Sequence, residues 1–323
     1  MKGPSIGLDF QVWGQFTSWD ALMAAGRAID ERGFGALYSN DHFLPPVGSA
    51  VKSGGRVDGP VFEGWMTLAG WAAATNRVQL GCLVSGAGYR TAGLLVKMAT
   101  ALDHASGGRA ILGLGAGWYE GEHRAFGFEY PSLGDRISRF EEQARAIRGL
   151  LDGESVTVTG RWVSMDAARN DPPALGQLPL LIGGSGEKRT LRIVAATADI
   201  WNGEGDPDTI RRRNGILDGY CAEIGRDPST IRRTVGAPPV MIRRTADGAR
   251  DVLDGIFRTN GMDAPEAAAA VIESPFVGTV DAVVRAVEAY RAAGAEAMVF
   301  DWPAPFDQGT LDALAGPVRE RLG

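Results

Sequence analysis

The chain has 323 residues, of which 45% are apolar and 22% are charged, and its formal net charge is −6. These values are close to those of globular proteins, so the chain can bury a sizeable core and is not expected to be disordered. The acidic balance argues against a nucleic-acid-binding protein, whose surface must neutralise phosphates with basic residues. No Pro/Ser-rich linker or low-complexity tract divides the sequence, and we expect one domain over residues 1–323.

The number and spacing of the cysteines, and the length of the apolar runs, indicate which metal sites, disulfides and cellular locations to expect. Cys82 and Cys221 lie far apart and outside any CxxC or Cys/His pattern, so neither a disulfide framework nor a zinc site is expected. The start of the chain, MKGPSIGLDF, lacks the apolar run of a signal peptide. No stretch reaches the roughly 18 apolar residues of a membrane span. We therefore expect a cytoplasmic protein with no metal, membrane or nucleic-acid partner.

The first part of the chain alternates short β-rich runs with longer segments of helical periodicity, which is the pattern of parallel βαβ units. Strands are predicted at 5–12, 35–39, 77–85 and 109–114. Helices are predicted at 19–32, 61–75, 92–105 and 133–151. Ser18 is in position to cap the first helix and Gly33 to end it. The same unit thus recurs four times.

The second part of the chain continues this rhythm after one interruption. Residues 156–165 alternate about Gly160, which predicts a small β-hairpin outside the main sheet. Further strands are predicted at 179–184, 197–202, 238–242 and 297–302. Helices are predicted from about 187, at 208–224, within 246–272, at 279–293 and at 308–321, with 259–276 loop-like. Eight strand–helix steps predict an α/β (β/α)8 TIM barrel with an inserted hairpin, in which function lies on the loops after the strands.

One of these loops, LIGGSGEKRT at 181–190, is a candidate phosphate site. Glycines let the backbone come close to an anion, and the free N–H groups of a helix that begins near Glu187 point toward it. A tight strand-to-helix turn without a ligand explains the pattern equally well. The spacing fits neither a P-loop nor a GxGxxG motif. The candidate residues are Gly183, Gly184, Ser185 and Gly186.

A second candidate site, SNDHF at 39–43, follows the second predicted strand and opens a loop at 44–60 that contains glycine and proline. A histidine beside a carboxylate can donate or accept a proton near neutral pH. Asp41 and His42 are therefore candidate catalytic residues. The alternative is that Asp41 caps the loop and His42 is a packed ring.

The third candidate, GLGAGWYEGEHRAFG at 113–127, leaves the fourth predicted strand through three glycines, which suggests a backbone packed closely on a flat ligand. Glu120 is a candidate catalytic proton carrier, as are Glu122 and His123. The alternative is that these side chains form the first turn of an exposed helix. They lie too close in sequence for a convincing metal site.

These motifs together resemble the bacterial luciferase-like family, and in particular its branch that uses the deazaflavin cofactor F420. The similarity covers nearly the whole chain in order and spacing. GGSGEKRTL followed by ADIWN favours the F420 branch. The strings that carry the resemblance are SNDHF (39–43), RVQLGCLVSGAGYR (77–90), LDHASGGRAILGLGAGWYEGEHRAFG (102–127), IGGSGEKRTLRIVAATADIWN (182–202) and VGTVDAVVRAVEAYRAAGAE (277–296).

The resemblance implies a barrel that holds its cofactor across the carboxyl-terminal mouth, and often a homodimer. It also implies a non-prolyl cis peptide at Leu83–Val84 behind the cofactor ring, with Asp41 and His42 beside the reactive ring. Sugar-phosphate dehydrogenases of this branch have a glutamate where this chain has Trp118, so a sugar-phosphate substrate is not expected. The expected cofactor-binding residues are Leu83, Val84, Gly115, Gly117, Gly183, Gly184, Ser185 and Gly186.

The function that the resemblance implies is hydride transfer between C5 of F420 and a small organic substrate, with His42 assisting proton transfer and Asp41 orienting His42. Two alternatives stay open: an FMN-dependent monooxygenase that activates oxygen on the same barrel, and a non-catalytic flavin-binding protein. FMN shares the first phosphate of F420, so one glycine loop serves either cofactor. Lys52 and Arg56 are candidate contacts for the polyanionic F420 tail, or solvated surface charges.

Overall fold

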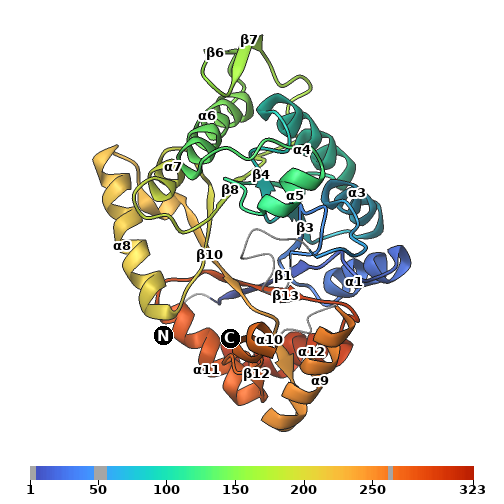
Figure 1. The fold of residues 1–323 in the computed structure, drawn as a ribbon. Helices are drawn as coiled ribbons and strands as arrows, with labels where there is room; N and C mark the ends of the chain where they lie inside the picture. Colours follow the sequence, from blue (N-terminus) through green and yellow to red (C-terminus); the bar gives the residue numbers. More distant parts are fainter. Residues whose placement is uncertain (1–4, 47–56, 261–264) are drawn as a thin grey trace.

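The computed structural model describes residues 5–46, 57–260 and 265–323, so Lys52 and Arg56 lie outside the described residues. Eight parallel strands close into a barrel, with helices packed around it (Figure 1), which confirms the predicted (β/α)8 fold. In spatial order the strands are β1 (Gly7–Val12), β2 (Ala36–Ser39), β3 (Gln79–Cys82), β5 (Ala110–Gly115), β8 (Leu180–Gly183), β9 (Ile200–Gly203), β10 (Arg232–Ala237) and β13 (Ala297–Trp302).

The helices follow the strands along the chain. Ser18 caps the first, its Oγ accepting a hydrogen bond from Ala21 N, and Gly33 turns the chain beyond its end with φ of 69°. The helices are α1 (Trp19–Glu31), α3 (Gly64–Ala74), α4 (Ala92–Ser106), α5 (Glu120–Ala125), α6 (Leu133–Leu151), α7 (Thr190–Thr197), α8 (Pro207–Glu223), α9 (Ala246–Thr259), α10 (Pro265–Ile272), α11 (Val280–Ala292), α12 (Gln308–Ala313) and α13 (Arg319–Leu322), with short turns η1 (Pro228–Thr230) and η2 (Leu314–Val318). Both predictions for the first helix are confirmed.

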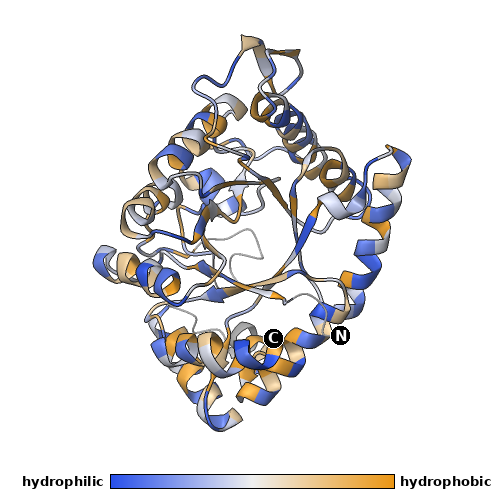
Figure 2. Cartoon of the chain, turned by 180° about the vertical axis from the view of Figure 1, so that it is seen from behind, coloured by the Kyte–Doolittle hydropathy of each residue, from blue (hydrophilic) through white to orange (hydrophobic). Residues whose placement is uncertain are grey.

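Side-chain alternation along each strand divides the core into two parts. Apolar side chains that face outward from β1 and β13, such as Phe10 and Phe300, pack with the helices in the main core. Inward-facing side chains, including Tyr38, Ile111 and Val299, fill the barrel interior. The outer helices in Figure 2 show hydrophobic and hydrophilic residues interspersed along their length, as expected when one face covers the barrel.

The inserted hairpin is also confirmed. Strands β6 (Val156–Thr159) and β7 (Ser164–Ala168) pair antiparallel with each other as a separate two-stranded sheet. Figure 1 places this hairpin at the outer edge of the molecule, beyond α6. The hairpin therefore adds to the barrel without contributing a strand to it.

The seventh barrel strand lies earlier than predicted. The expected strand at 238–242 is wrong, since the barrel uses β10 at Arg232–Ala237 instead. Pro238 and Pro239 have no N–H groups and cannot join the middle of a sheet, so the strand ends before them. The following strand β11 (Met241–Ile242) pairs only with β12 (Val277–Gly278), outside the barrel.

Three other boundaries differ from the prediction. The strand predicted at 77–85 is divided into β3 and β4 (Ser85–Gly86), because the peptide bond between Leu83 and Val84 is cis. The helix expected from about 187 begins at Thr190, and it continues through Thr197, where a strand was expected. Helix α10 forms within the segment that was expected to be loop-like.

Close contact between β3 and β5 leads to the first prediction. An ideal Cβ on Gly113 would lie 1.9 Å from the carbonyl oxygen of Cys82. We expect Gly113→Ala to lower the free energy of unfolding by about 1–3 kcal/mol or more, because the two strands must separate. Urea unfolding measures this effect.

The matched control is Gly219→Ala in α8, where an added Cβ meets no atom within 4 Å. This change should raise stability by about 0.5–1 kcal/mol through helix propensity. Equal stability of Gly113→Ala and the wild type would contradict the close spacing of the two strands.

Candidate active site

A cavity of about 800 Å³ lies at the carboxyl-terminal ends of the barrel strands. This is the end at which (β/α)8 enzymes carry their active sites. All but one of the residues expected at the cofactor line the cavity; Ser185 is the exception. Its lining includes Asp41, His42, Leu83, Val84, Gly115, Gly117, Gly183, Gly184 and Gly186.

The floor of the cavity contains the Leu83–Val84 peptide bond, which is cis as the resemblance implies. Gln11 donates a hydrogen bond from Nε2 to the Leu83 carbonyl oxygen at 2.7 Å. An ideal Cβ would lie 2.7 Å from Val84 Cγ2 on Gly115 and 2.9 Å from Val84 Cγ1 on Gly183. These two glycines therefore make room for Val84.

The glycine loop after β8 is held by its neighbours on β9. The Gly184 N–H donates to the Asn202 carbonyl, and the Trp201 indole N–H donates to the Gly184 carbonyl at 2.9 Å. Gly184 has φ of 125°, a conformation that favours glycine. Ser185 Oγ accepts a hydrogen bond from Glu204 N at 3.2 Å, which leaves its O–H group able to donate to an anion.

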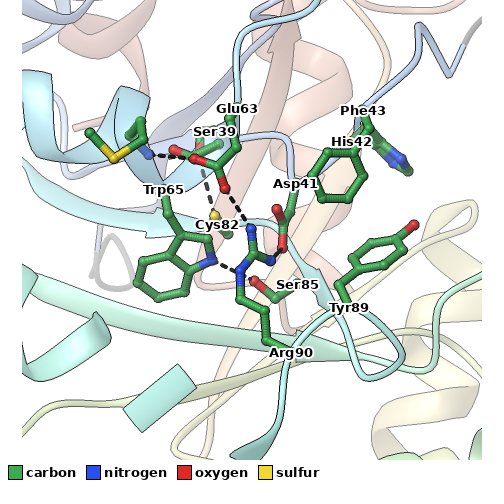
Figure 3. A network of polar contacts seen from close by, with 12 residues as sticks. Ser39, Asp41, His42, Phe43, Glu63, Trp65, Cys82, Ser85, Tyr89 and Arg90 are labelled. Atoms are coloured by element: carbon green, nitrogen blue, oxygen red, sulfur yellow. Dashed lines mark hydrogen bonds and ion pairs between the residues drawn. The ribbon is translucent and has the colours of Figure 1, made fainter. Parts of the chain in front are cut away.

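Asp41 is buried beside α3 and is bound by an arginine (Figure 3). Its Oδ2 pairs with Arg90 Nη1 at 2.6 Å, and Arg90 Nη2 pairs with Glu63 Oε1 at 2.5 Å. The second oxygen of Asp41, Oδ1, has no hydrogen-bond partner among the described residues. Asp41 therefore contacts Arg90 rather than His42. This differs from the prediction that Asp41 orients His42.

Glu122 is the carboxylate that orients His42. It is fully buried, and its Oε1 lies 2.8 Å from His42 Nδ1. Its Oε2 accepts hydrogen bonds from the backbone N–H groups of Phe43 at 2.8 Å and Leu44 at 3.3 Å, and Tyr89 donates its hydroxyl to Oε1. One carboxylate thus connects the loop after β2 to α5. Because Nδ1 of His42 is bound to Glu122, Nε2 is the ring nitrogen that can contact a ligand in the cavity.

Electrostatics favour a charged Glu122. Burial alone would raise the pKa of this carboxyl, but the hydrogen bonds and charge of His42, with those from Tyr89 and Phe43, hold its pKa below the ordinary value. Burial and the neighbouring Glu122 raise the pKa of Tyr89, so its hydroxyl stays protonated and donates. The arrangement suits a histidine that exchanges a proton with a ligand in the cavity.

The structure does not bring Glu120 into the cavity. Its carboxylate pairs with Arg124 one turn along α5, at 2.5 Å, and it is absent from the cavity lining. His123 is buried and its Nδ1 lies 2.9 Å from the Tyr119 carbonyl oxygen. Helical geometry separates the neighbours: Glu120 lies on the exposed side of α5 and Glu122 on the buried side. The sequence motif contains the carboxylate that binds His42, Glu122, but the motif alone does not distinguish it from Glu120.

Sequence reasoning also missed two carboxylates on the opposite side of the cavity, Asp301 and Glu204. Asp301 faces inward because its neighbours Phe300 and Trp302 pack in the outer core. The alternation of inward-facing and outward-facing side chains in AMVFDW was a usable signal. It predicts that the acidic side chain points into the barrel near the carboxyl-terminal end of the last strand. Trp118, half exposed, adds an aromatic side chain to the lining, 5.5 Å from the His42 ring.

A barrel of this kind, with a partly buried histidine held by a carboxylate beside a glycine-lined cavity, is typical of enzymes that bind a phosphate-bearing cofactor. The sequence profile described as luciferase-like monooxygenase matches residues 7–297, and the chain belongs to this family. It is therefore an enzyme of the oxidoreductase type. No helix in the described ranges has the length and apolar character needed to cross a membrane.

Two relatives are similar to this chain over most of its length. An uncharacterized protein of Mycobacterium tuberculosis is 27% identical over 253 residues, which cover 75% of this chain and 89% of that protein. A phthiodiolone/phenolphthiodiolone dimycocerosates ketoreductase from Mycobacterium sp. (strain JLS) is 31% identical over 226 residues, covering 67% of this chain and 58% of that enzyme. Neither likeness decides the substrate of this chain.

Solved structures with the same fold carry either cofactor. An F420-dependent secondary alcohol dehydrogenase in complex with an F420-acetone adduct has a TM-score of 0.78 and 17% identity, with 97% of this chain and 98% of that chain covered. A type II Baeyer-Villiger monooxygenase of Pseudomonas putida in complex with FMN has a TM-score of 0.73 and 15% identity, with 98% and 99% covered. At these identities the likeness shows the fold alone.

The contrast between the two glutamates of α5 provides the second prediction. Glu122→Gln should lower the free energy of unfolding by about 1–3 kcal/mol near pH 7, because the amide cannot accept all the hydrogen bonds that the carboxylate accepts. Glu120→Gln should change it by no more than about 0.5 kcal/mol, as for other exposed helix ion pairs. Urea unfolding of both variants measures the difference.

The pH dependence of the Glu122 effect has a definite sign. Since the pKa of Glu122 is lowered by folding, its stabilisation is complete above the ordinary glutamate value of about 4.3 and disappears as pH falls through the folded value. The gap between wild type and Glu122→Gln should therefore narrow in acid. A constant gap, or a larger loss in Glu120→Gln, would contradict this picture.

Proposed function

We propose that this oxidoreductase binds coenzyme F420 and transfers a hydride between the deazaflavin and a small organic substrate. The observation that carries the proposal is the position of His42, held by a buried carboxylate at the edge of a cavity whose other side is lined by glycines. The motifs of the F420 branch in the sequence and the fold shared with F420-dependent enzymes support it.

The residues present fit such a cofactor. Gly183, Gly184 and Gly186 form a backbone cradle, and a Cβ on Gly186 would lie 2.7 Å from Thr190 Oγ1. In the described part of the chain no backbone carbonyl accepts from the N–H groups of Ser185 and Gly186. Unpaired N–H groups on a glycine loop suit a phosphate. The Val84 side chain would lie behind the cofactor ring, which is the position expected from the resemblance for the Leu83–Val84 peptide.

Each side chain has a distinct role in the proposed reaction. When bound, the deazaflavin supplies hydride exchange at C5. His42 donates a proton to the substrate oxygen, or accepts one, at Nε2, while Glu122 holds Nδ1 and stabilises the protonated ring. Asp41, fixed by Arg90, presents its unpaired Oδ1 to the cavity as a hydrogen-bond acceptor for the ring. Trp118 shields the reacting atoms from water.

Titration of the purified protein tests the cofactor. We expect F420 to bind, and its riboside that lacks phosphate to bind at least about tenfold more weakly, because the glycine loop donates charge-assisted hydrogen bonds to phosphate. Fluorescence of the deazaflavin measures both affinities. The matched pair FMN and riboflavin is the comparison. Tight binding of FMN without binding of F420 would replace the proposal with an FMN-dependent monooxygenase.

A variant of His42 tests the chemical role. His42→Ala should lower kcat by about 10²–10⁴-fold, the usual contribution of a general acid or base, while F420 affinity changes little. The rate is followed by F420 absorbance with a panel of small alcohols and ketones. His104→Ala is the control. His104 lies on α4, and among the described residues its imidazole ring forms a hydrogen bond only with the Pro173 carbonyl. An unchanged rate in His42→Ala would remove the assigned role.

We propose a homodimer, as the resemblance to the family implies. A cytoplasmic location and a single domain stay predictions.

A further inference from the structure

The cavity mouth divides into two halves that differ in chemistry. The half formed by β3, β5 and β8 is lined by Val84 and glycines, and it includes the phosphate loop. The half formed by β9, β10 and β13 carries Glu204 and Asp301 on either side of the Gly236–Pro238 segment. Because the phosphate loop and Val84 both belong to the first half, a bound cofactor leaves the second half for the substrate.

Asp301 is an acid without a basic partner. It faces the barrel interior, in register with Gln11 of β1, whose side chain holds the Leu83 carbonyl on the cavity floor. The Trp13 side chain hydrogen-bonds to it, and no lysine or arginine among the described residues pairs with it. Burial, with a smaller contribution from the like charge of Glu204, raises the pKa of Asp301 to about 7, although the hydrogen bond from Trp13 acts in the opposite direction.

A second polar side chain in the lining, unlike Asp301, has an acceptor atom without any donor in the described part of the chain. Asn40 is 8% exposed, lines the cavity at the end of β2, and its Oδ1 has no partner among the described residues. The strands β2, β1 and β13 are adjacent, so Asn40 and Asp301 flank the same sector of the mouth. Buried acceptors without donors are costly, at about 1–3 kcal/mol each, and they are usually satisfied by a ligand.

The rim of this sector adds a third acceptor. Glu204 follows β9, and no basic side chain in the described ranges forms an ion pair with its carboxylate. Its backbone is fixed by the Ser185 hydroxyl and by Arg213, which donates to its carbonyl. The backbone of Glu204 is thus held in place, and its exposed side chain forms no ion pair with the described residues. A ligand that approaches from this side meets the carboxylates of Asp301 and Glu204, while Arg136, in the same lining, donates to the Gly117 carbonyl after β5.

We propose that Asp301, Glu204 and Asn40 form a substrate subsite that binds a hydrogen-bond donor, a hydroxyl or ammonium group that the substrate carries in addition to the reacting oxygen at His42, and that excludes a second, anionic group at this place. The assignment rests on the proposed function for the place of the cofactor. Carboxylates bind ammonium and hydroxyl donors through charge-assisted hydrogen bonds and repel another carboxylate. The substrate then lies with its polar end at β13 and the remainder toward His42.

Three matched probes test the subsite: benzylamine, benzyl alcohol and benzoate, which share one ring and differ in the polar group. Binding is measured by calorimetry at pH 8, above the pKa of Asp301, with F420 present at saturation. We expect benzylamine and benzyl alcohol to bind at least about tenfold more tightly than benzoate. In the double variant Asp301→Asn/Glu204→Gln the preference should fall to within about twofold. The control is Asp312→Asn, whose carboxylate pairs with Arg32 far from the cavity lining.

The outcomes separate this inference from the proposed function. Failure of F420 to bind, with the probe preference intact and lost in the double variant, rejects the cofactor and supports the subsite. Benzoate binding as tightly as benzylamine overturns the subsite. So does a double variant that keeps the probe preference but binds F420 more weakly, because the acceptors would then serve the cofactor. A folded double variant is confirmed by its unfolding midpoint, and Asp301→Asn alone is measured if the pair does not fold.

Discussion

The buried carboxylate of Glu122 is the interaction on which the site depends. It accepts hydrogen bonds from one imidazole, one phenol and two backbone N–H groups, which come from two separate segments of the chain. A buried charge is stable only when it is paired and hydrogen-bonded, and here the donors are the loop residues that the active site must position. The same contacts that make the charge tolerable therefore fix the direction of His42. Loss of any one donor loosens the others, since they share one acceptor group.

Backbone spacing sets the shape of the cavity in a similar way. Val84 occupies the floor only because Gly115 and Gly183 have no side chains there, and Gly113 lets β5 approach β3. These glycines serve the packing of the protein itself, in addition to any ligand. The flat, side-chain-poor surface that remains is suited to a planar ring, and the loop at Gly184 continues it toward a phosphate. In the proposed function, the acidic sector at β9 and β13 gives the cavity a direction, from the cofactor phosphate to the polar end of the substrate.

The family shows why fold and function must be argued separately. Enzymes that share this barrel use F420 or FMN, and they differ in substrate and in reaction. What distinguishes one member from another is the small number of side chains at the strand ends. In this chain those side chains are a histidine backed by a carboxylate, an arginine-bound aspartate and an acidic sector that forms no ion pair within the described ranges. They are the basis for the proposed substrate subsite.

Periodicity and turn residues in the chain were enough to predict the barrel, its hairpin and most element positions, because strand alternation and helix caps are local properties. The motifs likewise located the glycine loop, His42 and the cis bond at Leu83–Val84. Position along a helix or strand was not enough to choose between neighbours: Glu122 rather than Glu120 reaches His42, Arg90 rather than His42 binds Asp41, and β10 ends before Pro238. The end of β10 follows from the two prolines, but the partners of Glu122 and Asp41 depend on contacts between residues 80 and 49 positions apart, which form only when the barrel closes. The sequence by itself determines which chemical groups each segment carries. Tertiary packing determines which partner each side chain contacts.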